Sequence, residues 1–173
     1  RLESSKVFAK LLMENNRIPT ANAKIFDDPS AARKFCMEVG LPLVVKADGL
    51  AAGKGVAVCE TRAEVESAIE ACMETRLYGD AGAKILIEEC LRGQEISVFA
   101  FVDGENLSTL VPACDYKRLH DDDMGPNTGG MGSYSPPSFW SPELAVEIRD
   151  RIMRPTIEGL ASEGHRYQGI LYA

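Results

Sequence analysis

The most informative segment of the chain reads Leu43-Val44-Val45-Lys46-Ala47-Asp48-Gly49-Leu50-Ala51-Ala52-Gly53-Lys54-Gly55-Val56-Ala57-Val58. Its two β-branched ends predict two strands, and the small residues between them predict a flexible glycine loop. Small side chains let backbone N–H groups approach an anion closely, and Lys46 and Lys54 place positive charge on both sides of the loop. The segment therefore predicts a β-hairpin whose tip lies over a phosphate group.

Two common phosphate-binding patterns do not fit this hairpin. A Walker loop has four residues between its glycines, a hydroxyl residue after its lysine, and a helix behind it. Here three residues separate Gly49 from Gly53, Gly55 follows Lys54, and a β-branched run comes next. The dinucleotide pattern also fails, because Val58 occupies the place of its third glycine. The alternative interpretation is an ordinary glycine-rich hairpin tip.

The composition of the chain is typical of soluble globular proteins. It has 173 residues, 45% of them hydrophobic, and a net charge of −7, which argues against a nucleic-acid-binding or anionic-membrane-binding surface. No apolar run approaches the ~20 residues of a membrane span, and no signal peptide is visible. The five cysteines are scattered without a C-x-x-C pair, which predicts reduced thiols in a cytoplasmic protein, and two histidines argue against a zinc site.

The order of the predicted elements indicates an α/β (α+β) fold with two lobes and a nucleotide cleft between them. We expect the helix in residues 1–19 to pack with the larger lobe. Residues 20–87 would form a small lid lobe with the glycine flap, and residues 88–173 a larger antiparallel-sheet lobe. The chain starts at Arg1 rather than Met and stops in an apparent strand, so we expect truncation at both ends.

Capping residues and apolar spacing predict the individual helices and strands. The first helix runs from Ser4 or Ser5 to Asn15 with Phe8, Leu11 and Leu12 inward. Further helices are expected after Asp28, after the capping box at Thr61–Glu64, and from Ser141 to Gly164 with a kink at Pro155. Strands are expected over residues 23–26, 85–87, 96–102 and 107–111, and at the C-terminus. A turn at 103–106 is expected to join the strands 96–102 and 107–111.

A long loop follows the predicted strand that ends near Asp115. It holds four glycines in eight residues, together with Asn127 and Thr128, and these groups suit a small zwitterion or a carboxylate. The alternative is an acidic surface turn with a glycine spacer. The run Asp121–Asp123 is expected to be such a solvated turn, because the spacing of a calcium loop is absent.

The pair Glu88-Glu89 ends the predicted strand 85–87. Adjacent acids at a strand end usually face solvent. If this point is a hinge, its backbone groups can contact an adenine edge, while Glu95 accepts hydrogen bonds from ribose hydroxyls.

Taken together, the motifs resemble those of the phosphoribosylamine–glycine ligase family, which belongs to the ATP-grasp ligases. The resemblance rests on three parts of the sequence, and it covers essentially the whole chain in the same order. These parts are the hairpin Val44–Val56, the segment Glu88-Glu89-Cys90-Leu91, and Asp115-Tyr116-Lys117-Arg118 with Gly125-Pro126-Asn127-Thr128-Gly129-Gly130-Met131-Gly132. Tyr116 and Cys90 depart from the family pattern.

The resemblance implies a role for each matching residue. Binding of ATP is implied for Lys6, Lys46, Gly49, Ala51, Ala52, Gly53, Lys54, Gly55, Glu88, Glu89, Leu91 and Glu95. Binding of glycine and 5-phosphoribosylamine is implied for Asp115, Lys117, Asn127, Thr128, Gly129, Gly130, Met131 and Gly132. Catalytic roles are implied for Lys46, Lys117 and Asn127.

The implied reaction joins glycine to 5-phosphoribosylamine through glycyl phosphate, with ATP and Mg²⁺ (or Mn²⁺) whose ligands are expected beyond Ala173. The resemblance implies neither a nucleic acid nor a membrane as a binding partner. The protein is expected to be a monomer. The fragment alone is expected to be inactive. Two alternatives stay open: another ATP-grasp carboxylate–amine ligase, and a nucleotide-binding module without catalysis.

Overall fold

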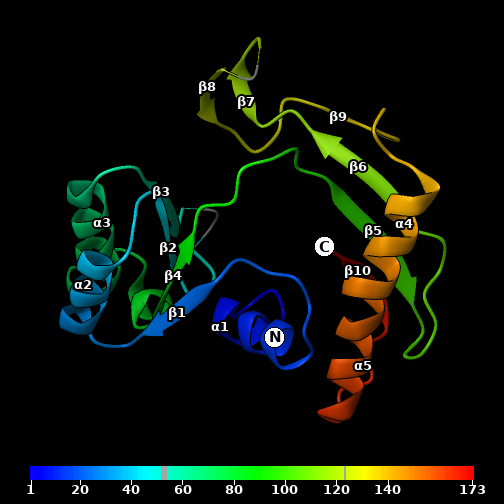
Figure 1. Ribbon diagram of the computed structural model, residues 1–173, viewed down its shortest axis with the longest axis horizontal. Helices are drawn as coiled ribbons and strands as arrows, with labels where there is room; N and C mark the ends of the chain where they lie inside the picture. The colour runs from blue at the N-terminus through cyan, green and yellow to red at the C-terminus, as the bar shows by residue number, and fades with distance from the viewer. Residues whose placement is uncertain (52–53, 123) are drawn as a thin grey trace. The chain divides into compact units, whose positions relative to one another are not determined.

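The computed structural model describes residues 1–51, 54–122 and 124–173 (Figure 1). These residues divide into two compact units: unit 1 comprises residues 1–14 and 20–92, and unit 2 comprises residues 15–19 and 93–173. The expected division differs at the N-terminus, because it assigned residues 1–19 to the larger lobe. Residues 1–14 pack with unit 1, where the backbone N–H of Lys6 donates to the carbonyl of Asp48 at 3.0 Å.

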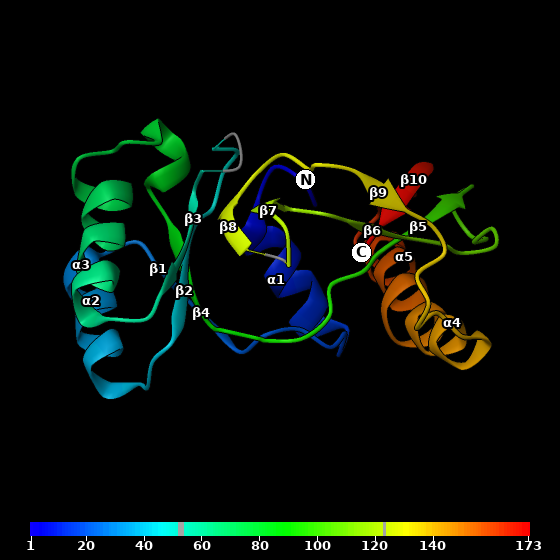
Figure 2. The same ribbon diagram turned by 90° about the horizontal axis from the view of Figure 1, so that it is seen from above.

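Unit 1 is built on an antiparallel sheet with the strand order β1-β4-β2-β3. Its strands are β1 (Ala23–Phe26), β2 (Leu43–Ala47), β3 (Val56–Cys59) and β4 (Ile85–Glu89). Helices α2 (Pro29–Glu38) and α3 (Arg62–Ile69) cover one face of this sheet, and α1 (Lys6–Asn15) lies on the other face (Figure 2). A π-helical turn at Glu70–Glu74 and a 3₁₀ turn at Gly79–Gly82 follow α3.

The core of unit 1 lies between the sheet and helices α2 and α3. Its buried members are Ala32, Cys36, Leu43, Val45, Ala47, Cys59, Val65, Ile69, Cys72, Ile85 and Ile87. Burying one large aliphatic side chain contributes about 1.5–3 kcal/mol, whereas an exposed ion pair contributes about 0–1 kcal/mol. The apolar core, and not the exposed pairs of Arg33 with Glu66 and Glu74, therefore holds the two helices on the sheet.

The caps of these helices follow the sequence signals. The Asp28 side chain accepts hydrogen bonds from the backbone N–H groups of Ser30 and Ala31, with Pro29 opening the helix. Thr61 and Glu64 form the reciprocal capping box of α3. Both predicted helix starts are confirmed.

The predicted glycine hairpin is formed by β2 and β3. The register pairs Leu43 with Cys59 and Lys46 with Val56, and the N–H of Ala47 donates to the carbonyl of Gly55 at 2.8 Å. Because side chains alternate along a strand, Val45 and Ala47 enter the helix-covered core while Lys46 points to the opposite face of the sheet. The hairpin thus carries its lysine on the α1 side of unit 1.

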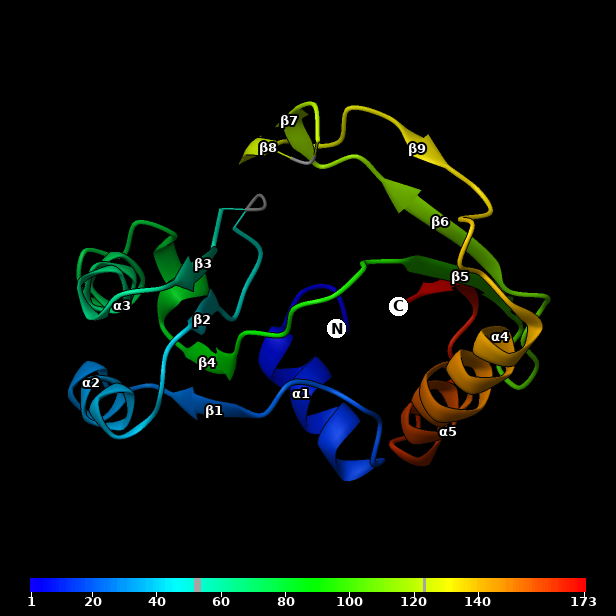
Figure 3. The ribbon, with the colours of Figure 1, turned by 45° about the horizontal axis from the view of Figure 1, so that its top comes forward.

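Unit 2 contains a second antiparallel sheet with the order β10-β5-β6-β9. Its strands are β5 (Ser97–Val102), β6 (Val111–Asp115), β9 (Ser133–Tyr134) and β10 (Gly169–Tyr172). A two-stranded ribbon, β7 (Arg118–His120) and β8 (Met124–Asn127), lies within the long loop where the sequence analysis expected no strands. Figure 3 shows the helical segment α4 (Pro142–Ile148), η3 (Arg149–Met153) and α5 (Arg154–Ser162) beside the sheet.

Two expectations for unit 2 need correction. The strand expected over residues 107–111 lies over 111–115 instead, and Leu107 makes only an isolated bridge to Val102. Proline usually argues against a strand, yet Pro112 pairs in register with Val98. The irregularity expected at Pro155 takes the form of the π-helical turn η3 immediately before it, since proline offers no N–H for the regular helical bond.

In the described part of the chain, no helix combines the length and the apolar character that crossing a bilayer requires.

Candidate functional site

A cluster of three charged side chains lies at the centre of unit 1, on the α1 side of the sheet. The Glu88 carboxylate contacts the Nζ of Lys46 through Oε2 at 2.6 Å and the Nζ of Lys10 through Oε1 at 3.1 Å. The side chains of Lys10 and Glu88 are 3% and 6% exposed, whereas that of Lys46 is 29% exposed. Lys46 is therefore the member of this cluster that a ligand in solvent can reach.

Strand β2 places Lys46 beside the flap with its ammonium partly exposed. The residue stands one position before the end of β2, next to the flap, and its ammonium remains partly exposed while it pairs with Glu88. A partly exposed ammonium can exchange part of this pairing for a phosphate oxygen. By contrast, the Glu88 carboxylate is enclosed by lysines within unit 1, so any contact of Glu88 with adenine stays a prediction.

Lys6 holds the base of the flap in this structure. Its Nζ donates to the carbonyl oxygens of Ala47 at 2.7 Å and of Gly49 at 3.0 Å. Burial lowers the pKa of the Lys6 ammonium from its ordinary value. The predicted contact of Lys6 with ATP phosphates would therefore add to, or replace, hydrogen bonds that this ammonium already makes.

Asp48 connects the same point of the flap to the N-terminus of α1. Its Oδ1 accepts hydrogen bonds from the hydroxyl of Ser5 at 2.9 Å and from the backbone N–H of Val7 at 2.7 Å. In addition, the N–H of Gly49 donates to the carbonyl of Ala81 at 3.2 Å. The flap thus starts from a position that two separate segments of unit 1 fix, the start of α1 and the turn at Ala81.

The other predicted nucleotide-binding residues of unit 1 lie along the flap and at the end of β4. At the flap, the N–H of Lys54 donates to the carbonyl of Ala51 at 2.8 Å, while Ala52 and Gly53 lie outside the described residues. At the end of β4, the Glu89 carboxylate accepts hydrogen bonds from the backbone and the side-chain amide of Asn22, at 2.8 and 2.9 Å. Leu91 follows with 68% of its surface exposed.

In unit 2, Lys117 lies between two predicted site carboxylates. Its Nζ is 2.5 Å from Oε2 of Glu95 and 3.8 Å from Oδ1 of Asp115, and all three side chains are exposed. The hydrogen bond that Lys117 donates to the Glu95 carboxylate raises the pKa of Lys117. This arrangement keeps a cation beside two anions on an open surface, which suits recognition of a ligand that carries both charges.

The predicted glycine loop is tied to the short connection between β6 and β7 that carries Lys117. The N–H and the hydroxyl of Thr128 both donate to the carbonyl of Lys117, at 2.6 and 2.9 Å, and the N–H of Gly130 donates to the Thr128 hydroxyl at 3.1 Å. The N–H of Met131 donates to the carbonyl of Tyr116, and that of Tyr116 to the carbonyl of Gly132. Asn127 lies in β8, and its side chain is outside the described part of the structure.

The structure therefore brings the predicted residues together in two groups, one in each unit. Lys6, Lys46, Gly49 and Glu88 gather around the base of the flap, and Glu95, Asp115, Lys117 and residues 128–132 gather around the glycine loop. Sequence reasoning missed Lys10 and Asp48. A signal for Lys10 was present, because it lies one helical turn after Lys6 on the same face of α1.

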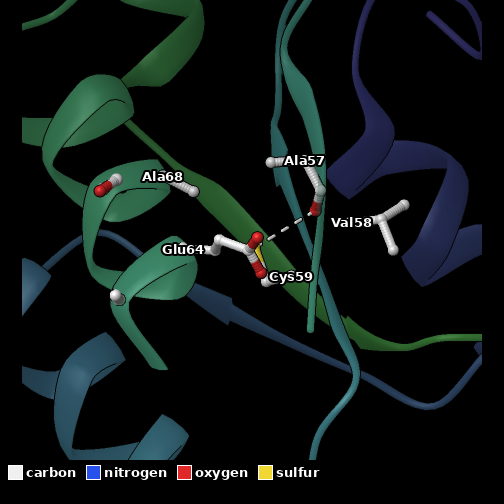
Figure 4. A pocket seen from close by; sticks show the side chains of 7 residues that line it. Ala57, Val58, Cys59, Glu64 and Ala68 are labelled. Carbon is white, nitrogen blue, oxygen red and sulfur yellow. Dashed lines mark hydrogen bonds between the residues drawn. The ribbon is translucent and has the colours of Figure 1, made fainter. Parts of the chain in front are cut away.

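A shallow hollow between β3 and α3 does not belong to either group (Figure 4). Its lining includes Ala57, Cys59 and Ala68, and the Cys59 thiol donates to the carbonyl of Ala57. The Glu64 carboxylate at its rim already accepts the N–H groups that cap α3. The described residues that line the hollow include no basic side chain, so they lack the charge that a phosphate group needs.

The side chains within the described ranges offer no group of three or more His, Cys, Asp and Glu residues arranged to hold a metal ion. The residues described here therefore do not themselves fit a complete divalent-cation site.

Comparison with known proteins identifies the family. Residues 4–173 match the family model described as phosphoribosylglycinamide synthetase, ATP-grasp (A) domain. The chain is 47% identical over 172 residues to the chloroplastic phosphoribosylamine–glycine ligase of Arabidopsis thaliana, a match that covers 99% of this chain and 32% of that protein. It is 46% identical over 173 residues to the phosphoribosylamine–glycine ligase of Nostoc sp., covering 100% of this chain and 40% of that protein. The chain thus spans about a third to two fifths of the length of these two relatives.

A solved structure agrees with this result. The crystal structure of the phosphoribosylamine–glycine ligase from Thermotoga maritima superimposes with a TM-score of 0.88 at 38% sequence identity, covering 99% of this chain and 43% of that one. The fold is therefore the ATP-grasp fold that the motifs predicted. The chain belongs to the phosphoribosylglycinamide synthetase family and corresponds to its ATP-grasp (A) domain.

Proposed function

We propose that this chain is the ATP-grasp part of an enzyme that joins glycine to 5-phosphoribosylamine at the expense of ATP, a step of purine biosynthesis. The observation that carries the proposal is the match of residues 4–173 to one family of such ligases. The alternatives considered from the sequence, another ATP-grasp ligase or a module without catalysis, have no comparable support.

In this proposal the residues of unit 1 bind the nucleotide. Lys46 and Lys6 contact the α- and β-phosphates, and the flap from Gly49 to Gly55 covers the triphosphate. The residues at and after the end of β4, together with Glu95 of unit 2, bind adenine and ribose. The partly exposed ammonium of Lys46 supports the first of these roles, since it combines a fixed position with access for a ligand.

The residues around Lys117 bind the two small substrates. Glycine carries an ammonium group and a carboxylate, so it can use the carboxylate of Asp115 as well as the cation of Lys117. The backbone N–H groups of Gly129 and Gly132 add neutral donors for a carboxylate or phosphate, whereas those of Gly130 and Met131 already donate to Thr128 and Tyr116. Asn127 completes the predicted set.

The chemistry needs no nucleophilic side chain from the protein. The glycine carboxylate attacks the γ-phosphorus of ATP, ADP leaves, and glycyl phosphate forms. The amine of phosphoribosylamine then attacks the carbonyl carbon, phosphate leaves, and the amine gives up a proton. The chain's task is to neutralise and orient the reacting groups, and one such contact is worth about 3–4 kcal/mol in the transition state.

The proposal also includes a divalent cation as cofactor and the cytoplasm as the cellular location. Mg²⁺ or Mn²⁺ would accompany ATP, and no ligand for it is assigned among the described residues. The five free cysteines suit a reducing compartment, and we place the reaction in the cytoplasm, with the enzyme acting as a monomer.

The test is ADP release by the full-length protein that contains this chain. We expect release to require ATP, glycine and freshly generated phosphoribosylamine together. Release that responds to bicarbonate or another carboxylate but not to glycine would point to a different ATP-grasp ligase. Binding of ATP without release under any of these conditions would point to a module without catalysis.

A further inference from the structure

The buried ion-pair cluster of unit 1 contains a residue that the proposed function leaves without a role, Lys10. We propose that Lys10 is a positioning residue: through the shared carboxylate of Glu88, it fixes the Lys46 ammonium where a nucleotide phosphate meets it. This inference rests on the proposed function, because it deepens the assignment of Lys46 to ATP.

Lys10 cannot serve the ligand directly, because its ammonium is buried and occupied. The side chain is 3% exposed. Its three N–H donors match three acceptors, namely the hydroxyl of Thr20 at 2.6 Å, the carbonyl of Ala21 at 2.7 Å and Oε1 of Glu88 at 3.1 Å. A lysine ammonium with all three donors used is held in one position. Its contact with the carboxylate of Glu88 therefore also fixes the orientation of that carboxylate.

Glu88 connects Lys10 with Lys46. Its carboxylate is buried, and a buried carboxylate stays charged only when cations and hydrogen bonds surround it. One oxygen contacts Lys10 and the other contacts Lys46, so the orientation of the carboxylate set by Lys10 also sets where the Lys46 ammonium lies. Strand β4 adds to this control, because it pairs with β2 in a register that places Glu88 opposite Val44, two residues before Lys46.

Charge supports the same role. The cluster contains two ammonium groups and one carboxylate, so it carries a net positive charge that favours a polyphosphate. Without Lys10, the remaining pair of Glu88 and Lys46 is neutral, and among the described residues the carboxylate keeps only Lys46 as an ionic partner. Glu88 would then bind the Lys46 ammonium more strongly, and this ammonium would be less available to a phosphate oxygen.

The experiment measures ATP affinity of the full-length enzyme for Lys10→Met, alone and combined with Lys46→Met. We expect Lys10→Met to weaken ATP binding roughly tenfold in the wild-type background and less than twofold when Lys46 is already Met, because residues that share one ion-pair network couple by about this much. The KM for ATP should rise while the KM for glycine stays unchanged. Lys24→Met is the matched control, since Lys24 is an exposed lysine of β1 in the same unit, and it should leave ATP affinity unchanged.

A milder variant protects the test against misfolding of Lys10→Met. Thr20→Val removes one acceptor of Lys10 while keeping the side-chain shape, and we expect a smaller loss of ATP affinity that also disappears in the Lys46→Met background. Equal losses in both backgrounds, or no loss in the wild-type background, would overturn the positioning role.

The failures of the two proposals can be told apart. If ATP binding shows the coupling but glycine and phosphoribosylamine do not stimulate ADP release, the proposed reaction is wrong and the positioning role holds. If the wild-type enzyme performs the reaction and the effects of Lys10→Met and Lys46→Met are independent, the positioning role alone is wrong.

Discussion

The Oδ1 atom of Asp48 accepts a hydrogen bond from the backbone N–H of Val7 at 2.7 Å, and so a residue at the base of the flap caps a helix that is distant in sequence. Helix N-termini leave N–H groups without intrahelical partners, and Asp is among the preferred residues for satisfying them. The cap therefore couples the order of α1 to the position of the flap. Both elements carry a lysine that we assign to ATP, Lys6 on α1 and Lys46 on β2.

The first prediction concerns this cap. Asp48→Ala removes the acceptor for Val7 and for the Ser5 hydroxyl, and we expect it to weaken the start of α1 by about 1–2 kcal/mol. Hydrogen exchange of peptides covering residues 5–9 should accelerate, and the KM for ATP should rise. Asp28→Ala, which removes the cap of α2, serves as control: exchange should accelerate in α2 while the KM for ATP stays constant. An unchanged exchange rate at residues 5–9 in Asp48→Ala would contradict the coupling.

The second prediction concerns the packing of Gly49. A Cβ atom at this position would lie 2.7 Å from the Cβ and 2.8 Å from the Cα of Ala81. Backbone at that distance cannot move aside easily, so Gly49→Ala should destabilise unit 1 by about 1–3 kcal/mol, measured as a lower unfolding midpoint. Gly40→Ala, whose added Cβ would have no heavy atom within 4 Å, should show no such loss. Equal midpoints for the two variants would contradict the close approach.

The third prediction concerns Lys46 itself. In the full-length enzyme, Lys46→Met should lower kcat about 100-fold, because a charge that neutralises the α- and β-phosphates of the departing ADP is lost. The fold should remain, since Glu88 keeps its pair with Lys10, and the circular dichroism spectrum should be unchanged. A variant with wild-type turnover would remove the central assignment of the ATP site.

The fourth prediction separates two neighbouring glycines of the substrate loop. Gly130 has φ +111°, a conformation that side chains disfavour, whereas Gly129 has no such restriction, and an added Cβ at either residue would meet no neighbouring atom. Gly130→Ala should therefore raise the KM for glycine or phosphoribosylamine severalfold through its backbone alone, as steady-state kinetics can measure. Gly129→Ala should have little effect, and a reversal of this order would contradict the loop's role.

The fifth prediction concerns the pH dependence of Lys117. Its pKa is raised above the ordinary lysine value of 10.5, chiefly by the hydrogen bond with Glu95, so the pair is present below that pH and is lost as the pH rises through the higher folded-state value. Glu95→Gln removes this cause, and the Lys117 ammonium should then lose its proton at a lower pH. An NMR titration of the lysine side chain measures the shift. An unchanged titration would show that the contact with Glu95 does not persist in solution.

The sequence by itself determined the elements whose signals are local. The alternation of β-branched residues around a run of small residues specified the β2–β3 hairpin, since strand pairing across a short loop depends on neighbours in the chain. The caps at Asp28 and Thr61 were equally predictable from sequence, because a capping residue and the N–H groups it binds lie within four residues of each other. The motifs also identified the family, which needs no coordinates.

Only the tertiary structure decided which charged residues work inside the protein. Apolar spacing predicts Leu11 on the inner face of α1, yet Leu11 is 44% exposed and Lys10 is buried. From sequence alone, a lysine side chain is predicted to be exposed to solvent, because burying its charge is costly unless partners surround it. Those partners, Glu88, Thr20 and Ala21, come from other parts of the chain, and only folding places them around Lys10. For the same reason, the role of Asp48 as the cap of α1 became visible only when the sheet and the helix were seen together.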